Sequence, residues 1–387
     1  MSETELRVEK LVYGGDGLSR DNGRVVLTPF VLPGETVRAE VSRAKNDLLR
    51  GRLLEVTAPA PQRTAPRCPY FLRCGGCHYQ HAAYEFQKEQ KRAILLETLR
   101  RTGGIDYPGE VALVSAAPWE YRNRVQLHIA AGKIGYFEAA SHALVAIDHC
   151  PIASPRLNEC IGTLAQALPG MRPFAATLEM FTNERDVQWS LADRAPKPFI
   201  ALLRTLGVNS PIEYGGFRVS RDTFFQVNRL LLDRLVEVTV GENAGRLAMD
   251  LYAGAGLFTL PLARRFQRVD AIEAGIGAFR DLEHNAAASG ILNLTAHNET
   301  AEAYLMTVTE PPETIVADPP RTGLGKLAVK ELIRIRSARL TLVSCDPVTL
   351  ARDLKALLAA GYRIEEMTLM DLFPQTAHFE TIVRLAA

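Results

Sequence analysis

A single cysteine follows an apolar run directly in "RLTLVSCDPVTLARDL" (339–354). Two interpretations of Cys345 are open: it is a small core residue that ends a strand, or it is a nucleophile at the rim of a site. A deprotonated thiol forms covalent bonds to electrophilic substrates. The second interpretation therefore predicts covalent catalysis at the end of this run.

A carboxyl group ends a second apolar run, in "TIVADPPRTG" (314–323). Asp318 follows the run directly, and the two prolines behind it stiffen the turn. In open α/β sheets, ligands lie at the carboxyl ends of the strands. We therefore expect Asp318 and Cys345 to lie at the same edge of one sheet.

A glycine loop follows a third run, in "MDLYAGAGLFTLPLAR" (249–264). Gly254 and Gly256 allow a sharp turn and leave room for a ligand near a helix N-terminus. The next strand ends in Glu273, 23 residues after Asp250, where an acid is placed to accept hydrogen bonds from ribose hydroxyls. Thr259 stands where a dinucleotide motif has its third glycine. The pattern favours a nucleoside cofactor without a pyrophosphate, above all S-adenosylmethionine.

Three cysteines gather within ten residues, at Cys68, Cys74 and Cys77. A fourth thiolate would have to come from elsewhere; Cys150 lies in a turn before a proline, whereas Cys160 has a helical pattern typical of the core. Four thiolates fit either zinc or an iron–sulfur cluster. One triplet with one remote cysteine favours iron–sulfur, although the spacing is not that of the radical S-adenosylmethionine enzymes.

The elements that must position these groups fall into three predicted domains. Residues 1–58 alternate short β-rich runs with Gly and Pro turns, which predicts an antiparallel barrel of about five strands. Residues 59–211 form a central α+β domain that carries the cysteines and an amphipathic helix over 82–102. Residues 212–387 alternate strands and helices, which predicts an α/β domain with a parallel, doubly wound sheet.

The composition is that of a globular chain of 387 residues, with a formal net charge of +1. No overall positive field indicates a nucleic-acid partner, but eight basic residues oppose three acids between Arg38 and Arg73. No secretory h-region or membrane-spanning run is present. We expect a cytoplasmic monomer that has no membrane association and no protein partner.

These motifs together resemble the RNA 5-methyluridine methyltransferases, which act on ribosomal RNA or tRNA. The catalytic-domain signatures match in order at "FFQVN" (224–228), "DLYAGAGLF" (250–258), "DPPR" (318–321), "SCDPVTLARDL" (344–354) and "HFETIVRL" (378–385). "CPYFLRCGGCHYQH" (68–81) and "SHALVAIDHCPI" (141–152) match the four-cysteine site, and "YGGDGLSR" (13–20) resembles a TRAM module.

The resemblance implies a Rossmann-like S-adenosylmethionine-dependent methyltransferase domain behind a TRAM/OB-like barrel. It implies a [4Fe–4S] cluster on Cys68, Cys74, Cys77 and Cys150. It also assigns Cys345 as nucleophile and Glu380 as base, although the sequence around Glu380, taken alone, is typical of a surface acid. Leu257 and Thr300 depart from the polar residues of some family members. The predicted cofactor contacts are Gln226, Tyr252, Gly254, Glu273 and Asp318.

The implied reaction explains why these residue types are needed. Addition of the Cys345 thiolate to C6 of uracil makes C5 nucleophilic towards a sulfonium methyl, and Glu380 then removes the C5 proton so that the thiolate leaves. Arg321 is a candidate for lowering the pKa of the thiol or for stabilising the developing oxyanion.

The expected substrate is a uridine of structured RNA, with 23S rRNA before tRNA, that is flipped out or single-stranded. Arg122 and Arg124 are either phosphate contacts or exposed arginines of a core strand. Two other functions stay open: an iron–sulfur RNA-binding protein without activity, and a cytosine-C5 RNA methyltransferase.

Overall fold

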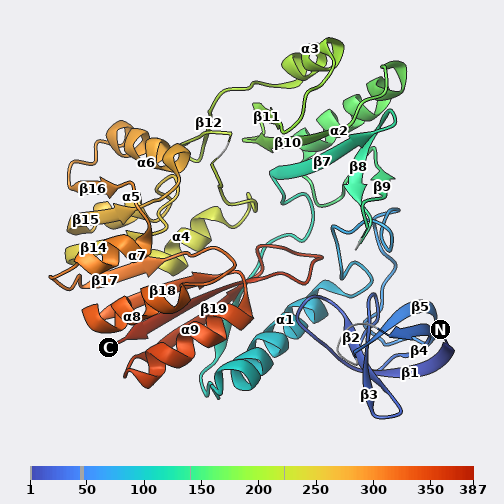
Figure 1. Ribbon diagram of the computed structural model, residues 1–387, viewed down its shortest axis with the longest axis horizontal. Coiled ribbons are helices and arrows are strands. Elements are labelled where there is room, and N and C mark those ends of the chain that lie inside the picture. The colour runs from blue at the N-terminus through green and yellow to red at the C-terminus, as the bar shows by residue number, and fades with distance from the viewer. Residues whose placement is uncertain (1, 44–47, 140, 222) are drawn as a thin grey trace. The chain divides into compact units, whose positions relative to one another are not determined.

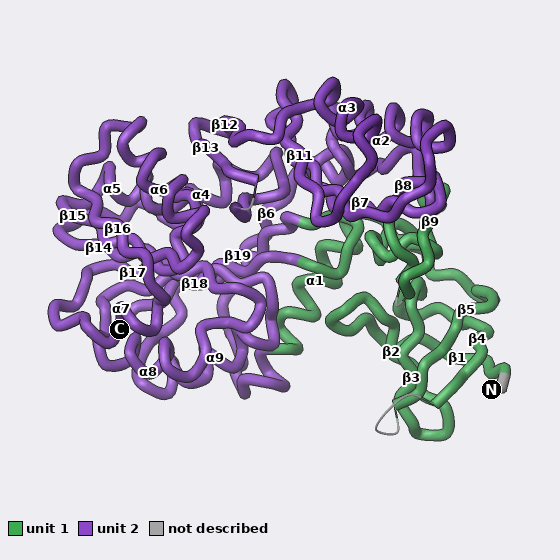
Figure 2. Tube along the Cα trace, turned by 45° about the horizontal axis from the view of Figure 1, so that its top comes forward, with its two compact units in different colours: residues 1–98, 136–145, 373–378 green, residues 99–135, 146–372, 379–387 purple. Residues whose placement is uncertain are grey.

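A computed structural model describes residues 2–43, 48–139, 141–221 and 223–387 (Figure 1). The chain divides into two compact units (Figure 2). Unit 1 contains residues 1–98, 136–145 and 373–378, and unit 2 contains residues 99–135, 146–372 and 379–387. None of the described helices is both long enough and apolar enough to cross a lipid bilayer.

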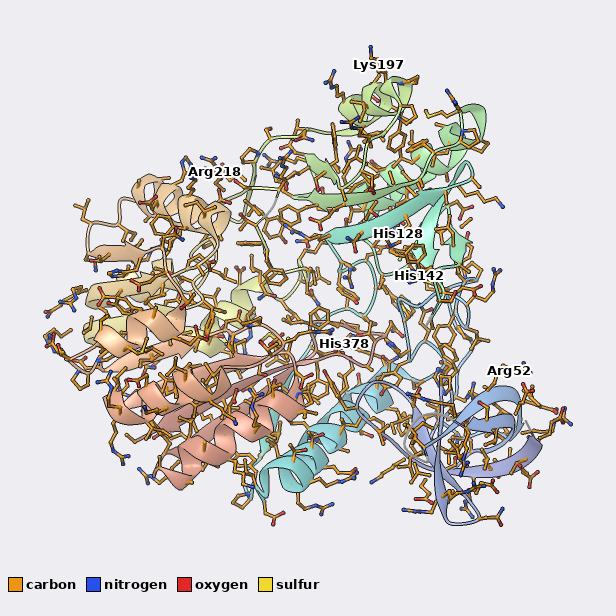
Figure 3. All side chains as sticks on the ribbon, viewed as in Figure 1. Arg52, His128, His142, Lys197, Arg218 and His378 are labelled. Atoms are coloured by element: carbon orange, nitrogen blue, oxygen red, sulfur yellow. The ribbon has the colours of Figure 1, made fainter. Side chains whose placement is uncertain are left out.

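The N-terminal part of unit 1 is a closed barrel, as its alternating sequence predicts. The strands are β1 (Ser2–Leu11), β2 (Gly17–Asp21), β3 (Arg24–Thr28), β4 (Thr36–Arg43) and β5 (Leu49–Ala58), in the order β1-β2-β3-β5-β4. Leu6, Val8, Val26 and Val37 point inward and form its core. On the outside, Arg52 forms an ion pair with Glu40 (Figure 3). Acids of the barrel therefore neutralise part of the basic stretch.

The amphipathic helix of unit 1 is shorter than the sequence predicts. Helix α1 spans Tyr84–Thr98, and a wider π-helical turn over Leu99–Gly103 follows it in unit 2. This turn packs on helix α9 (Pro347–Ala359). A Cβ at Gly103 would lie 2.9 Å from the Ala351 carbonyl oxygen, so the close approach requires glycine.

A five-stranded antiparallel sheet occupies the middle of the chain. Its order is β11 (Val187–Leu191), β10 (Ala176–Thr182), β7 (Arg124–Ala130), β8 (Lys133–Phe137) and β9 (Leu144–Ala146). Helices α2 (Pro155–Ala167) and α3 (Lys197–Leu206) accompany it, and β12 (Ile212–Tyr214) pairs with β13 (Phe217–Val219). Cys160 of α2 is fully buried, as its helical pattern predicts.

The C-terminal part of unit 2 is the predicted doubly wound sheet with helices on both faces (Figure 1). Its strands are β16 (Leu294–His297), β15 (Phe266–Ile272), β14 (Gly245–Leu251), β17 (Thr314–Ala317), β18 (Arg339–Ser344), β20 (Glu380–Ala386), β19 (Arg363–Met370) and β6 (Val111–Val114), in that order. Its helices, besides α9, are α4 (Leu232–Val240), α5 (Thr259–Ala263), α6 (Ile276–Ala288), α7 (Ala301–Thr307) and α8 (Gly325–Ile335).

Strand directions in this sheet depart from a wholly parallel arrangement at one edge. The first five strands run parallel, whereas β20 is antiparallel to both β18 and β19. The strand order reverses at β14 and β17, where open α/β sheets bind ligands. Strand β6 comes from the region expected to form the central domain, and it covers the backbone edge of β19 by parallel pairing.

Candidate active site

Three neighbouring strands of the catalytic sheet end close together, and two of them end at the same level. Leu251, Ala317 and Leu342 are aligned across β14, β17 and β18. Tyr252 and Asp318 come directly after the first two strands. Cys345 comes directly after Ser344, the last residue of β18, which extends two residues beyond Leu342. The parallel register therefore brings the three predicted groups to one edge of the sheet.

The antiparallel pairing of β18 with β20 places Cys345 next to Glu380. Ser344 pairs with Thr381 as the last pair of the ladder, so Cys345 and Glu380 lie directly beyond it, and the Glu380 carboxyl is close enough to act on the thiol. Behind the thiol, Asp346 caps helix α9 by accepting hydrogen bonds from Val348 and Thr349. Cys345 is consequently held between a strand end and a capped helix.

The Cys345 thiol is half-buried, and its surroundings favour the neutral form. Burial, reinforced by the charge of the Glu380 carboxyl, raises its pKa to about 11. The Arg321 guanidinium opposes this by its charge and by a hydrogen bond to the sulfur. Arg321 thus lowers the pKa in the direction that the sequence predicts, but it does not overcome burial.

Two carboxyl groups beside the thiol also hold their protons more tightly than usual. Burial raises the pKa of Glu380 well above its ordinary value, and the neighbouring Asp318 adds to the effect. Burial likewise raises the pKa of Asp318 to about 7. Glu380 is only 5% exposed and is therefore not the surface acid that its local sequence suggests. A cation bound here would stabilise the ionised form of both groups.

The glycine loop is fastened by the acid that the sequence assigns to ribose binding. The Gly254 amide donates to Glu273 Oε2 at 2.8 Å, and the Gly275 amide donates to Oε1 at 2.6 Å. Each carboxylate oxygen keeps a further lone pair for a ligand hydroxyl. Gly254 has φ 58° and open space beside it, as a ligand loop requires.

Tyr252 has a strained backbone at the start of this loop. Its φ of 62° is rare for a residue with a bulky side chain, and such strain often marks a binding site. Its hydroxyl oxygen is buried and has no hydrogen-bond partner in the described part of the chain. An unsatisfied hydroxyl at this position fits contact with a bound ligand.

Asp250 and Thr259 form a buried pair that the sequence reasoning missed. The Thr259 hydroxyl donates to Asp250 Oδ2 at 2.5 Å across the glycine loop. Burial raises the pKa of Asp250 to about 7. Thr259 was seen only as a replacement for a third glycine, yet its hydroxyl ties the start of α5 to the end of β14.

Gln226 lies in a loop that buried polar groups fix on both sides. It is 7% exposed. On one side, Asp281 of α6 accepts hydrogen bonds from the Ser220 amide at 2.7 Å and the Thr223 hydroxyl at 2.9 Å. On the other side, the Asn228 side-chain amide (Nδ2) donates to the Leu372 carbonyl at 3.0 Å.

Arg124 belongs to this scaffold rather than to the surface. Its guanidinium donates to the Thr223 carbonyl at 3.0 Å and lies 3.2 Å from Glu179. It also stacks on the ring of Phe181. Arg124 thus lies on a core strand, but its guanidinium is engaged within the protein and is not the exposed arginine that the core-strand interpretation expects.

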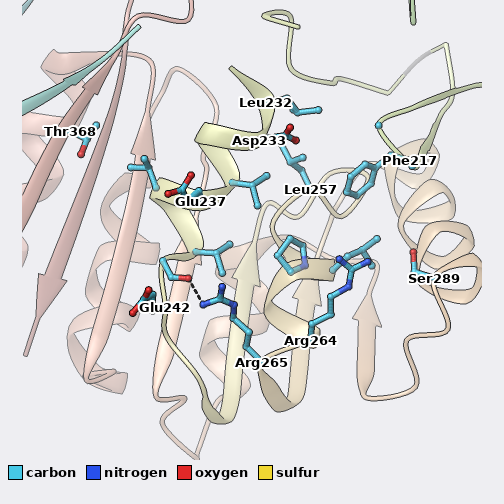
Figure 4. A pocket seen from close by; sticks show the side chains of 18 of the residues that line it. Phe217, Leu232, Asp233, Glu237, Glu242, Leu257, Arg264, Arg265, Ser289 and Thr368 are labelled. Atoms are coloured by element: carbon cyan, nitrogen blue, oxygen red, sulfur yellow. Dashed lines mark hydrogen bonds between the residues drawn. The ribbon is translucent and has the colours of Figure 1, made fainter. Parts of the chain in front are cut away.

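The two positions that depart from the family pattern have structural explanations. Thr300 caps helix α7 by accepting the Ala303 amide at 3.2 Å. Leu257 is 8% exposed and lines a cavity of about 760 Å³ beside α4, α5 and the turn at 215–217 (Figure 4). None of the residues predicted for catalysis or cofactor binding lines this cavity. We therefore do not place the reaction there.

The four cysteines predicted to bind a cluster are divided between the units. Cys68, Cys74 and Cys77 belong to unit 1, and Cys150 belongs to unit 2. None of them forms a disulfide, and all are half-buried. The donor chemistry fits an iron–sulfur cluster, but no three His, Cys, Asp or Glu side chains of the described residues are grouped to hold a metal ion.

Comparison with known proteins identifies the family of the chain. The family model described as tRNA (Uracil-5-)-methyltransferase matches residues 205–387, and the TRAM domain model matches residues 2–54. A protein of Aquifex aeolicus named an uncharacterized RNA methyltransferase is 34% identical, with 98% of each chain covered. The 23S rRNA (uracil(1939)-C(5))-methyltransferase RlmD of Edwardsiella ictaluri is 29% identical over 95% of this chain and 92% of its own.

A solved structure shares the fold over nearly the whole chain. It is the tRNA (uracil-54, C5)-methyltransferase of Pyrococcus abyssi in complex with S-adenosyl-L-homocysteine, with a TM-score of 0.75 and 24% identity. The match covers 99% of this chain and 100% of that one. With its N-terminal TRAM domain and its catalytic sheet, the chain belongs to the RNA uracil-5-methyltransferases, the family described as tRNA (uracil-5-)-methyltransferase.

Proposed function

We propose that this enzyme uses S-adenosylmethionine to methylate C5 of a uridine in structured RNA, with 23S rRNA as the first candidate and tRNA as the second. The observation that carries the proposal is the register that sets Cys345 beside Glu380, next to Arg321 and Asp318. A nucleophile, a carboxyl base and a cation meet here at a strand edge suited to a ligand. The relatives named for 23S rRNA support the choice of substrate.

The residues at the strand ends fit a cationic nucleoside cofactor. When bound, S-adenosylmethionine supplies an electrophilic methyl group on a positively charged sulfur. Glu273 retains lone pairs for the ribose hydroxyls, and the Tyr252 hydroxyl is available for a new hydrogen bond. We assign cofactor contacts to Gln226, Tyr252, Gly254, Glu273 and Asp318.

In the proposed mechanism, Cys345 and Glu380 act one after the other on the two carbons of the C5–C6 bond of uracil. The Cys345 thiolate adds to C6 of uracil, and the electron pair of the C5–C6 double bond moves towards the O4 oxygen. Arg321 is near enough to the thiol to stabilise negative charge in this step. C5 then takes the methyl group, Glu380 removes the C5 proton, and the returning electron pair expels the thiolate.

The pKa values of the resting site favour a coupling between ligand binding and proton loss. Burial raises the pKa of Cys345 to about 11, which favours the neutral thiol, and it raises the pKa of Glu380 as well. A positive charge nearby lowers both pKa values. The thiolate is therefore formed where a methyl donor is already in place.

We also propose that Cys68, Cys74, Cys77 and Cys150 hold a [4Fe–4S] cluster with a structural role. The support is the set of four half-buried thiols without disulfides. In addition, the Cys68 amide donates to Gln80 Oε1 at 3.0 Å, and the Cys150 amide donates to Asn158 Oδ1 at 2.8 Å. Anaerobically purified protein is expected to contain iron and sulfide, and Cys150→Ser is expected to lose both.

The remaining sequence predictions belong to this proposal as well. The domains are residues 1–58, 59–211 and 212–387, and the protein acts in the cytoplasm as a monomer. Gel filtration of the purified protein, without and with RNA, tests the oligomeric state. A dimer would contradict it.

The decisive experiment uses 5-fluorouridine, which cannot lose a proton from C5. The protein is incubated with S-adenosylmethionine and with 5-fluorouridine-substituted 23S rRNA or tRNA. A denaturation-resistant protein–RNA adduct is expected with the substrate RNA, and no adduct is expected with Cys345→Ala. An adduct that persists in Cys345→Ala would remove this residue from the mechanism, and 5-methylcytidine in unsubstituted RNA would favour the cytosine alternative.

A further inference from the structure

A short segment before Glu380 belongs to a different unit from the residues on either side of it. Residues 373–378 belong to unit 1, whereas Leu372 and Phe379 belong to unit 2 (Figure 2). We call residues 373–378 the base-side segment. His378, labelled in Figure 3, is its last residue, and Glu380 is two positions further on. The conformation of this segment sets how the chain enters β20.

Backbone groups next to the cysteine triplet hold the middle of the base-side segment. The amides of His78 and Tyr79 both donate to the Gln375 carbonyl, at 2.9 and 3.0 Å. The Ala377 amide donates to His78 Nδ1 at 3.3 Å. His78 follows Cys77 directly, so the cysteine loop is one residue away from this contact.

Helix α1 holds the same segment through two buried polar side chains. Gln87 Nε2 donates to Gln375 Oε1 at 3.0 Å, and the Gln375 amide donates to Gln87 Oε1 at 3.1 Å. Lys91 Nζ donates to the Phe373 carbonyl at 3.0 Å. Gln87 and Lys91 are 1% and 0% exposed, which is unusual for these residue types.

Gln87 has every hydrogen of its amide group engaged with backbone or side-chain acceptors of unit 1. Besides Gln375, Gln87 Nε2 contacts the carbonyls of Tyr79 at 3.1 Å and Ala82 at 2.9 Å. Gln375 itself has φ 67°, a left-handed backbone conformation that costs energy outside glycine. A buried polar network that satisfies its members fixes one conformation. The network therefore holds the segment in a shape that it would not adopt by itself.

We propose that Gln87 and Gln375 are positioning residues for the base: through the base-side segment, helix α1 and the end of the cysteine loop hold Glu380 in place for removal of the C5 proton. The inference rests on the proposed function, since it requires Glu380 to be the base. It assigns to the cysteine-bearing unit a part in the second half of the reaction.

The inference predicts a specific division of the effects on the reaction. Attack by Cys345 and methyl transfer do not need Glu380 as a base, whereas release of the product does. When Glu380 is displaced, the methylated covalent adduct with ordinary uridine is expected to accumulate. A variant that only destabilises the fold would reduce adduct formation and product release together.

The test compares Gln87→Leu with Gln90→Leu, a substitution on the same helix, in the full-length protein with its cluster. RNA labelled with tritium at C5 of uridine and methyl-labelled S-adenosylmethionine are used in single-turnover experiments. For Gln87→Leu we expect tritium release to fall about tenfold or more, with methylated, denaturation-resistant adduct formed nearly as fast as by the wild type. Gln90→Leu is expected to behave as the wild type.

Glu380→Gln separates this inference from the proposed function. If Glu380→Gln accumulates no methylated adduct, the assignment of the base fails, and the inference fails with it. If Glu380→Gln accumulates adduct but Gln87→Leu lowers adduct formation and tritium release equally, the proposed function stands and the positioning role is wrong. If Gln87→Leu does not fold, Gln375→Asn, which tolerates a positive φ, is judged by the same two rates.

Discussion

At the scale of residues, the proposed nucleophile and the proposed base both have raised pKa values. Burial raises the pKa of the Cys345 thiol and of the Glu380 carboxyl, and each neighbouring acid reinforces the effect. Arg321 is the group that acts against it. A resting thiol in its neutral form reacts slowly with oxidants and alkylating agents.

The reactivity of Cys345 towards iodoacetamide is expected to depend strongly on pH and on Arg321. In the cofactor-free protein, alkylation should keep rising as the pH approaches a pKa of about 11. Arg321→Met removes a positive charge and a hydrogen bond, so its profile should shift to still higher pH. Peptide mass spectrometry measures Cys345 separately from the buried Cys160. An unchanged profile in Arg321→Met would show that the guanidinium does not act on the thiol.

Asp250 is expected to make the folded state less stable as the pH rises. Its folded pKa of about 7 lies above the ordinary 3.8, so the unfolded chain loses this proton first. The contribution of Asp250 to stability is complete below pH 3.8 and is lost as the pH rises through 7, at about 1.4 kcal/mol for each pKa unit. Asp250→Asn removes this dependence.

Thermal unfolding between pH 5 and pH 8 measures the effect. The Tm of the wild type should fall more steeply with pH than the Tm of Asp250→Asn, which keeps an oxygen acceptor for Thr259. Asp106→Asn, at an exposed position, is the control and should follow the wild type. Parallel curves for wild type and Asp250→Asn would contradict the raised pKa.

At the scale of elements, the loop that carries Gln226 depends on one buried carboxylate of α6. Asp281 accepts three hydrogen bonds from Ser220 and Thr223 and forms an ion pair with Arg218, which Figure 3 labels. Loops that carry functional groups require a rigid support to place them. Helix α6 therefore supports one side of the loop that carries Gln226.

Removal of this carboxylate is expected to affect both stability and catalysis. Asp281→Ala leaves buried donors of Ser220 and Thr223 without acceptors, which should lower the free energy of unfolding by about 1–3 kcal/mol for each group left unpaired. We also expect kcat/KM to fall about tenfold because Gln226 is displaced. Urea unfolding and steady-state kinetics measure the two effects.

Two further variants on α6 decide how the result is read. Asp281→Asn keeps acceptor oxygen and should recover part of both losses, and Glu283→Ala, exposed on the same helix, should match the wild type. A loss of stability with kcat/KM unchanged would show that the loop does not need this support.

At the scale of the whole molecule, the sequence predicted the elements whose pattern lies within one segment, and it did not predict those that depend on pairing between distant segments. Period-2 runs with Gly turns predicted the barrel, and alternating strands and helices predicted the catalytic sheet, because both patterns lie within single segments. Strand β6 was missed because four apolar residues carry too little periodicity. Its assignment depends on pairing with β19, more than 250 positions away.

The prediction of the site residues has the same limit, because local patterns do not contain contacts between distant segments. Cys345, Asp318 and Gly254 were predicted from strand ends, a local feature. Glu380 was predicted only through the resemblance, since its burial follows from pairing with β18. Gln87 lies on a helix with an amphipathic sequence, in which polar residues are expected on the solvent-exposed face. Its burial arises from contact with Gln375, separated from it by 288 positions, and no local pattern contains that information.

The coupling of the cysteine loop to the base-side segment leads to a prediction about the whole chain. Loss of the proposed cluster by Cys77→Ser should loosen His78 and Tyr79, whose amides hold the Gln375 carbonyl. Hydrogen exchange should then become faster in peptides that cover residues 373–378, because protection there depends on unit 1. Strand β14, central in the catalytic sheet, should keep its protection and serves as the internal reference. Unchanged exchange at 373–378 in a protein that has lost its iron would show that the segment is held by α1 alone, and that the cysteine loop has no part in placing the base.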